Sequence, residues 1–382
     1  MSNIAILIFI DDVMSAGNAN EARKAIRSFK VMEDLKKYTY GLKKTKVMVT
    51  NNGKDDEEEI EEEVSMGKIT KTDEYKYVGF HLNKDANCLF HIEHKNGSIK
   101  GQITALKSIA NYYNVGSKFI LVRLYLYEAC IVHSLLHGIE AWNRQTKTEL
   151  KNLEKIQAYA LCQILELPRS TPYIGLLSEL GMWRIQERID YRRIMYTQNL
   201  LKSDDRRLAK RVILDQKESE EEDTFYDTAK QRLEKYGVDI DMIADMKKSE
   251  LKKTVKERIN NKMEAMFEET AKKMKKLRFI TDFKCKRKEY FTQMDGFECL
   301  QTIKTRLNML PVYANYRADV SMQSTCEHCG KVEDNTEHLV ECEVLGETII
   351  TKENLKDTSN AHTWRLINER VRFNLDNRLN QK

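Results

Sequence analysis

Four residues near the C-terminal end of the sequence have the types and the spacing of a metal site. They follow the pattern Cys326-x2-Cys329-x8-His338-x3-Cys342. Two thiolates separated by two residues can hold one zinc ion from a tight turn, and a histidine and a cysteine four positions apart on a helical turn can complete a tetrahedron. The spacing therefore predicts a zinc knuckle. His328, between the first two cysteines, is expected to take no part in it.

A second candidate site lies near the N-terminal end. Asp11 and Asp12 follow an apolar run from Ile4 to Ile10, and Val13 and Met14 are again apolar. This pattern predicts strand, tight turn and strand. Carboxylates at such a turn stand clear of the sheet, where two divalent ions that bridge substrate phosphates would need them. An ordinary turn or the cap of a following helix is the alternative interpretation.

A third candidate is the segment from Lys272 to Lys288, called the basic segment below. It holds nine basic residues against one acid, Asp282, and the nine are Lys272, Lys273, Lys275, Lys276, Arg278, Lys284, Lys286, Arg287 and Lys288. Four rings lie in or beside it: Phe279, Phe283, Tyr290 and Phe291. Interleaved cations and rings are typical of a surface that follows a nucleic-acid backbone and stacks bases. A solvated helix end whose rings join the core is the alternative.

The composition predicts a mainly helical α+β protein. The chain has 382 residues, 41% apolar and 32% charged, with only three prolines and fifteen glycines, which is typical of a globular, helix-rich chain. The net charge of +5 requires no polyanionic partner by itself, so such a partner depends on local patches. Charged residues interrupt the apolar segment from Lys118 to Trp142, which is expected to be a buried helix and not a membrane span. Without a signal peptide pattern, we expect an intracellular location, in the nucleus or cytoplasm.

Hydrophobic spacing places the expected elements. A helix is predicted from Asn18 to Tyr38, a strand from Lys43 to Val49, a solvated acidic loop from Asp55 to Glu63, and strand character from Tyr75 to Leu82 with Gly79 inside it.

From Ile99 onward the pattern predicts helices. One runs from Leu150 to Leu165, and the next, reaching Leu180, is expected to take its cap and its first-turn proline from Ser170-Thr171-Pro172 and to end at Gly181. Further helices are predicted for Trp183 to Leu201, Thr224 to Tyr236, Asp239 to Lys276, and the tail around Trp364 to Leu375.

Taken in order along the chain, these motifs resemble the reverse transcriptases of non-LTR retrotransposons. Phe9-Ile10-Asp11-Asp12, Lys44-Thr45 and Tyr75-Lys76-Tyr77-Val78-Gly79 resemble the last third of the polymerase palm. Gly138-Ile139-Glu140-Ala141-Trp142, Leu153-Glu154-Lys155-Ile156-Gln157 and the stretch from Leu167 to Gly181 look like the helical thumb, and the distal zinc knuckle is similar too. The resemblance covers nearly the whole chain, and the order of the motifs makes it specific.

The resemblance implies four parts. These are a truncated palm remnant with a metal-binding hairpin at residues 1–98, a helical thumb at 99–217, a long basic helical linker at 218–320, and a CCHC zinc knuckle with a C-terminal helix at 321–382.

The resemblance also implies roles for single residues. Asp11 and Asp12 match the metal-binding pair of the palm, with Asp11 as the main Mg²⁺ ligand. Lys44 matches a basic residue near the nucleotide phosphates, and a solvent-facing strand lysine is the alternative. Gly79 resembles the primer-grip turn, although a simple β-turn explains it equally well. Mg²⁺ would need a further carboxylate from an upstream palm strand, which is expected before residue 1 together with the fingers.

Two functions follow as expectations. The first is a fragment of an RNA-directed DNA polymerase that is inactive alone, with an RNA template, a DNA target or primer, and a separate polypeptide that could supply fingers and palm. The second is a zinc-dependent protein that binds RNA or DNA without catalysis. No membrane is expected as a partner.

Overall fold

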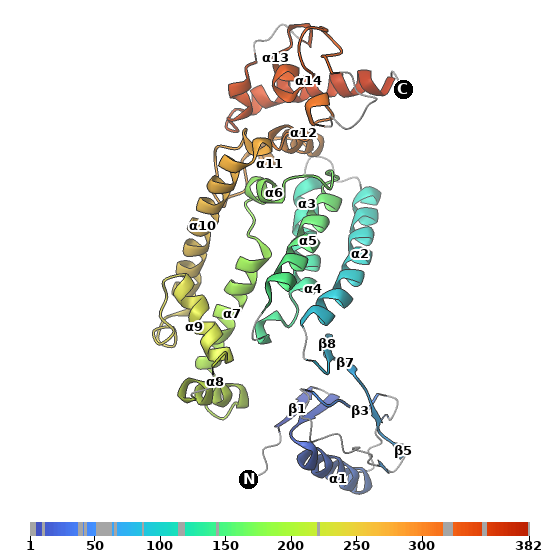
Figure 1. Cartoon of the computed structure of the whole chain (residues 1–382), viewed down its shortest axis with the longest axis vertical. Coiled ribbons are helices and arrows are strands. Elements are labelled where there is room, and N and C mark those ends of the chain that lie inside the picture. The colour runs from blue at the N-terminus through green and yellow to red at the C-terminus, as the bar shows by residue number, and fades with distance from the viewer. Residues whose placement is uncertain are drawn as a thin grey trace. The chain divides into compact units, whose positions relative to one another are not determined.

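The chain divides into two compact units, Met1–Lys95 and Asn96–Lys382. The computed structural model describes residues 5–9, 12–36, 41, 44–50, 63–64, 67–85, 88–113, 119–142, 145–219, 222–315, 324–345 and 350–380. The described strands belong to the first unit and most of the helices to the second (Figure 1). The predicted class, α+β and mainly α, is therefore confirmed. The division into palm remnant, thumb, linker and knuckle stays a prediction.

The first unit opens with the predicted hairpin. β1 (Ala5–Phe9) pairs antiparallel with β2 (Asp12–Ala16), and Phe9 lies opposite Asp12 at its closed end. The strand pair is confirmed, whereas Asp11 lies outside the described residues. α1 (Ala19–Lys36) follows, near the predicted bounds. Its N-terminus is closed by a capping box, because the Asn18 side chain accepts from the Glu21 N–H at 3.0 Å and the Glu21 side chain accepts from the Asn18 N–H at 3.1 Å.

The other strands are short and form separate pairs. They are β3 (Lys46–Val47) with β6 (Thr70–Lys71), parallel, and two antiparallel pairs, β4 (Glu63–Val64) with β5 (Gly67–Lys68) and β7 (Glu74–Tyr77) with β8 (Phe80–Asn83). The predicted strand from Lys43 to Val49 was too long. A turn occupies its start, since the Lys44 and Thr45 N–H groups both donate to the Gly41 carbonyl. The acidic loop lies largely outside the described residues.

The second unit is built from helices, the first of which begins in the first unit. They are α2 (Cys88–Tyr113), α3 (Phe119–Leu126), the π-helix η2 (Tyr127–Val132), α4 (His133–Leu135), η3 (Ile139–Ala141), α5 (Lys147–Ile164), α6 (Tyr173–Leu180), α7 (Ile185–Leu201), α8 (Leu208–Glu218), α9 (Phe225–Lys235), α10 (Lys248–Lys273), η4 (Lys275–Leu277), α11 (Tyr290–Gln293), α12 (Gly296–Arg306), η5 (Tyr313–Asn315), α13 (Thr336–Glu341), η6 (Glu343–Leu345), η7 (Lys352–Leu355) and α14 (Ala361–Asn380).

Helix α7 packs against α5, α8, α9, α10 and η3. Farther along the chain, α14 packs against α12 and α13, and its buried Trp364 confirms the predicted packed helix in the tail. The apolar segment that contains α3, η2 and α4 is buried at Leu124, Tyr127 and Ile131, as predicted. No helix in the described part of the chain combines the length and the apolar character needed to cross a lipid bilayer.

Two helix starts differ from the prediction. Pro172 is the N-cap of α6 and not its first residue, and the Thr171 hydroxyl donates backward to the Pro168 carbonyl at 2.6 Å instead of capping the helix. Helix α10 begins at Lys248 and not at Asp239, because the Asp239 side chain accepts from the Asp241 N–H and supports a turn there. The predicted end of α6 is confirmed, since Gly181 closes it with φ of 62°.

Candidate metal centre and the basic segment

The four predicted ligands converge. The sulfur atoms of Cys326, Cys329 and Cys342 and a ring nitrogen of His338 all lie within 4.8 Å of one another. The Cys326 and Cys342 sulfurs are 4.0 Å apart, and the Cys329 sulfur lies 3.2 Å from Nε2 of His338. A tetrahedral zinc ion with Zn–S bonds of about 2.3 Å separates its sulfur ligands by about 3.8 Å. The cluster can therefore hold a metal ion such as zinc. His328 lies outside it, as expected.

A turn and a short helix position these ligands. The Cys326 N–H donates to the Val332 carbonyl and the Gly330 N–H to the Cys326 carbonyl, each at 2.8 Å. Gly330 has φ of 68°, a conformation that favours glycine, and this lets the chain reverse after Cys329. On the other side, the Asn335 side chain accepts from the His338 N–H at 2.8 Å and caps α13, whose C-cap is Cys342. The predicted return from one helical turn is confirmed.

The electrostatics of the thiols differ across the cluster. A backbone hydrogen bond from Lys331 lowers the pKa of Cys329, which is only partly buried. Burial raises the pKa of Cys342 to about 11. Because a thiol must lose its proton to bind zinc, the buried Cys342 would depend more than Cys329 on the ion to become a thiolate.

An ion pair joins the helix of the metal centre to the basic segment. Nε and Nη2 of Arg278 donate to the two carboxylate oxygens of Glu337 at 2.6 Å and 2.7 Å. Burial opposes ionisation of Glu337, but the hydrogen bonds from Arg278 bring its pKa below the usual value. Glu337 directly precedes His338. The basic segment and a metal ligand are thus joined through one bidentate pair, the strong geometry for arginine and carboxylate.

A fully buried ion pair ties this region to α6. Nε of Arg306 lies 3.0 Å from both carboxylate oxygens of Glu179, and the Tyr290 hydroxyl donates to the same carboxylate at 2.8 Å. Arg306 also donates to the Leu355 carbonyl at 2.9 Å. Burial, followed by the Glu179 charge, raises the pKa of Tyr290 far above its ordinary value. The Glu179–Arg306 pair therefore links α6, α11 and α12 to the segment at Leu355, which follows the four metal ligands in the sequence.

The basic segment lies against the end of α6. A Cβ atom on Gly181 would come within 2.3 Å of the Arg287 nitrogen and 2.4 Å of the Lys286 carbonyl carbon. Only a glycine allows this approach of two backbones. This close contact holds the backbone at Lys286 and Arg287 against the C-terminal end of α6.

The cations of the basic segment have different environments. Lys272 and Lys273 pair with Glu268 and Glu269 one helical turn back, and Lys286 lies 4.0 Å from Glu289. Lys288 is buried and pairs with Asp282 at 3.0 Å, so it is not available to a partner. Three exposed cations make no ion pair within the described residues, and they are Lys275, Lys284 and Arg287.

Most rings of the segment belong to the core. Phe279, Tyr290 and Phe291 are buried, with at most 2% of each residue exposed, and only Phe283 is half-buried. The alternative in which the rings join the core is therefore the one observed for these three residues. The exposed face is cationic and lacks the row of rings that base stacking by the segment would require.

The residues expected at the N-terminal site belong to three different strand pairs of the first unit. Asp12 lies in β2, and Lys44 is exposed in the turn before β3. Gly79 and Val78 form the tight turn between β7 and β8, with φ of 80° and 46°. Positive φ at both positions is the rule for a two-residue hairpin turn. The simple β-turn thus accounts for Gly79, while its role at a primer stays a prediction.

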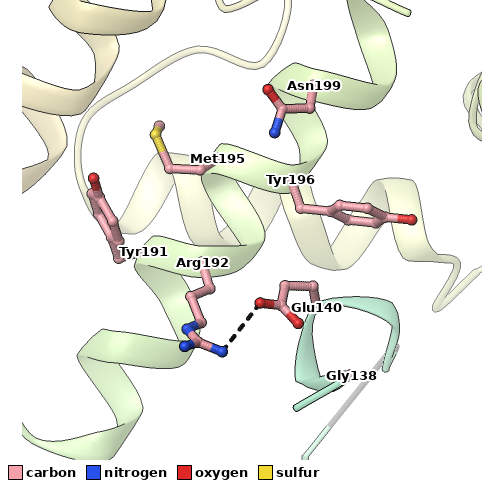
Figure 2. Close-up of a pocket in the computed structure, with 7 residues that line it drawn as sticks. All are labelled: Gly138, Glu140, Tyr191, Arg192, Met195, Tyr196 and Asn199. Atoms are coloured by element: carbon pink, nitrogen blue, oxygen red, sulfur yellow. Dashed lines mark hydrogen bonds and ion pairs between the residues drawn. The ribbon is translucent and has the colours of Figure 1, made fainter. Parts of the chain in front are cut away.

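A pocket in the helical unit has no counterpart in the sequence predictions. Figure 2 shows its lining, with a rim formed by Glu140 of η3 and Arg192 of α7, whose charged groups are 3.3 Å apart. Tyr191, Tyr196 and Asn199 line it from α7, and its volume is about 450 Å³. Gly138, at φ of 74°, marks the turn that brings Glu140 to α7. The sequence signal for it was Gly138, directly before the short helix η3.

Comparisons with protein-family models, with curated proteins and with solved structures give no match to this chain.

Proposed function

We propose that this chain is a zinc-binding protein that binds nucleic acid, related to the palm end, thumb and zinc knuckle of non-LTR reverse transcriptases. One observation carries the proposal. Four ligand atoms of the types and spacing that zinc prefers lie within 4.8 Å of one another, beside a segment in which cations far outnumber acids.

We infer that the zinc site is structural and not catalytic. A set of three cysteines and one histidine fills all four positions of a tetrahedron, and a closed zinc site has no open position for a substrate. The ion would hold the turn around Cys329 and helix α13 together. Through Glu337 it would also fix Arg278 and hence the course of the basic segment.

The basic segment supplies the electrostatic contact. Lys275, Lys284 and Arg287 are exposed cations without a carboxylate partner in the described residues. Such cations contact phosphates without reading sequence. The partner is therefore a nucleic acid recognised mainly through its backbone, which fits an RNA template or a DNA target.

The second candidate function is that of a reverse transcriptase part. The β1–β2 hairpin, with Asp12 at its closed end, favours it, because paired strands of this kind carry the metal-binding acids in the resembled palm. Two adjacent acids on one hairpin do not make the converging oxygen cage that Mg²⁺ requires. We therefore propose that this polypeptide has no polymerase activity without a partner that supplies a further carboxylate.

Two assays test these proposals. The first measures the affinity of the full chain for a fluorescent RNA and a DNA oligonucleotide, with and without a zinc chelator. We expect affinity to fall when the metal is removed, and unchanged affinity would contradict the structural role of zinc. The second is primer extension with Mg²⁺. Extension by the chain alone that is lost in Asp11→Asn would contradict the proposed inactivity.

A further inference from the structure

The loop after α5 and the segment after α12 enclose a second pocket of the helical unit, with a volume of about 350 Å³. None of its lining residues belongs to the candidate metal centre or to the basic segment. Its apolar walls include Leu167, Pro168, Met309 and Pro311. Two of the three prolines of the chain thus line one small pocket. Proline rings and a methionine give flat, adaptable apolar walls that suit a planar ring.

A buried acceptor in this lining has no donor. Gln301 of α12 lines the pocket and is 4% exposed. Its side-chain oxygen is buried and receives no hydrogen bond within the described part of the chain. Buried polar groups in proteins are nearly always paired, because an unpaired one loses its hydration without compensation. The pocket lining therefore contains an unpaired acceptor, which a ligand N–H group would satisfy if the Gln301 side chain turned toward the pocket.

A cation in the same lining has no carboxylate of its own. Lys304, one helical turn after Gln301, is half-buried and forms no ion pair within the described residues. Glu166 also lines the pocket and affects Lys304 by its charge, but its carboxylate is already held by Arg123 at 2.9 Å. Burial lowers the pKa of the Lys304 amine against the opposing effect of Glu166. A half-buried ammonium without a partner is suited to an anionic group of a ligand.

The pocket adjoins the basic segment. Nζ of Lys276 lies 3.8 Å from the sulfur of Met309, which is one of the apolar wall residues. A strand that follows the basic segment past Lys276 would therefore come close to the pocket. The three features required by a nucleotide, an anion site, an acceptor and a flat apolar wall, occur together at this point.

We propose that this pocket binds one unpaired nucleotide, with its phosphate on Lys304, its base against the proline walls and a base N–H group donated to the side-chain oxygen of Gln301. The source we favour is a nucleotide within a bound single strand, and that source rests on the proposed nucleic-acid function. A free mononucleotide offers the same chemistry and is distinguished by the experiment.

The experiment measures how fast the Lys304 amine of the full chain reacts with an acylating reagent, followed by peptide mass spectrometry. The probes are oligodeoxycytidylate, an abasic oligomer of equal length, and cytidine monophosphate. We expect oligodeoxycytidylate to slow the reaction of Lys304 several-fold, while the abasic oligomer leaves it unchanged. The exposed Lys284 serves as the control for general shielding, and the abasic oligomer should protect it as well as the cytidine oligomer does.

Variants separate the pocket from the basic segment. Gln301→Leu and Lys304→Met should each weaken binding of oligodeoxycytidylate by roughly tenfold, the usual effect of losing a buried or charged hydrogen-bond partner. Neither should alter binding of the abasic oligomer. Lys275→Met, the matched control on the exposed face, should weaken both oligomers equally.

The outcomes distinguish two failures. Binding of the oligomers that neither variant changes, together with an unprotected Lys304, would overturn the pocket and leave the proposed function standing. No binding of either oligomer, with Lys304 still protected by cytidine monophosphate, would overturn the proposed function and retain a nucleotide pocket. Equal protection of Lys304 by the abasic oligomer would also overturn the pocket, because it would show a phosphate contact without a base.

Discussion

The metal centre and the N-terminal hairpin both contain residues predicted to bind metal, but the chain supplies the two sets of ligands differently. Between Cys326 and Cys342 a single turn and one short helix bring all four ligands together. Asp12 lies at the closed end of a hairpin, and the Mg²⁺ site implied by the resemblance needs oxygen atoms from elsewhere. A locally closed site can be predicted from spacing, whereas a site assembled from distant strands requires the topology.

The largest effect should come from removing a metal ligand. Cys342→Ser should abolish zinc binding, because structural zinc contributes on the order of 10–16 kcal/mol of apparent binding free energy in small zinc domains. Elemental analysis should find one zinc per chain in the wild type and none in the variant. Hydrogen exchange should increase across residues 324–345.

The matched control for the metal centre is His328→Asn, which changes a histidine that lies outside the cluster. It should retain the zinc and the protection from exchange. A Cys342→Ser protein with a full complement of zinc would show that the four residues do not form the site.

The next prediction compares how much two ion pairs of the helical unit, one fully buried and one partly exposed, contribute to the free energy of unfolding. Glu179→Gln leaves the fully buried Arg306 without its counter-charge. Breaking such a pair costs roughly 3–5 kcal/mol in the free energy of unfolding, which urea denaturation would measure. Glu337→Gln breaks the more exposed pair with Arg278 and should cost no more than about 1 kcal/mol. Equal losses in the two variants would contradict this distinction.

Gly181→Ala tests the contact between α6 and the basic segment, and its loss in the free energy of unfolding should exceed the cost of the positive φ alone. The positive φ alone should cost about 1–2 kcal/mol, and the new Cβ would also meet the backbone at Arg287. Gly237→Ala is the matched control, since Gly237 has φ of 63° but no atom within 4 Å of an added Cβ. Urea denaturation should show the greater loss for Gly181→Ala, and only that variant should weaken oligonucleotide binding. Equal losses would mean that the close approach does not matter.

The smallest effect is expected at the hairpin. Asp12→Asn keeps the size of the side chain, so it should change the free energy of unfolding less than the variants at Cys342, Glu179 and Gly181 do, and it should leave oligonucleotide binding intact. Urea denaturation and the same fluorescence assay measure both. A marked loss of binding would place the hairpin in the nucleic-acid site. The hairpin would then contribute to binding, as the metal centre is proposed to do.

Much of the helical unit could be predicted from the sequence. The helices at α5, α7 and α9 have apolar residues at helical spacing, and Thr224 forms the capping box that starts α9. The start of α6 was wrong because Thr171 bonds backward to Pro168, a local alternative that spacing does not reveal. The strand after Lys43 was too long because a turn around Gly41 competes with it.

The metal ligands could be predicted because their geometry depends on a few consecutive backbone conformations. The Glu179–Arg306 pair and the pocket lined by Gln301 and Lys304 could not be predicted, because their residues lie more than a hundred positions apart in the sequence. The burial of Phe279 and Phe291 was equally ambiguous, since a ring beside lysines can face either solvent or core.

The bidentate contact of Arg278 with Glu337 has a consequence for salt dependence. A cation already paired with a carboxylate does not neutralise a phosphate, so it displaces few of the counterions that are condensed on a bound strand. Within the basic segment, Lys275, Lys284 and Arg287 should then contribute. With the phosphate contact proposed for Lys304, the plot of log affinity against log salt should have a slope of about −2.8 for a single strand, at about −0.7 per contact. Arg287→Met should flatten this slope by about 0.7, whereas Arg278→Met should leave it nearly unchanged.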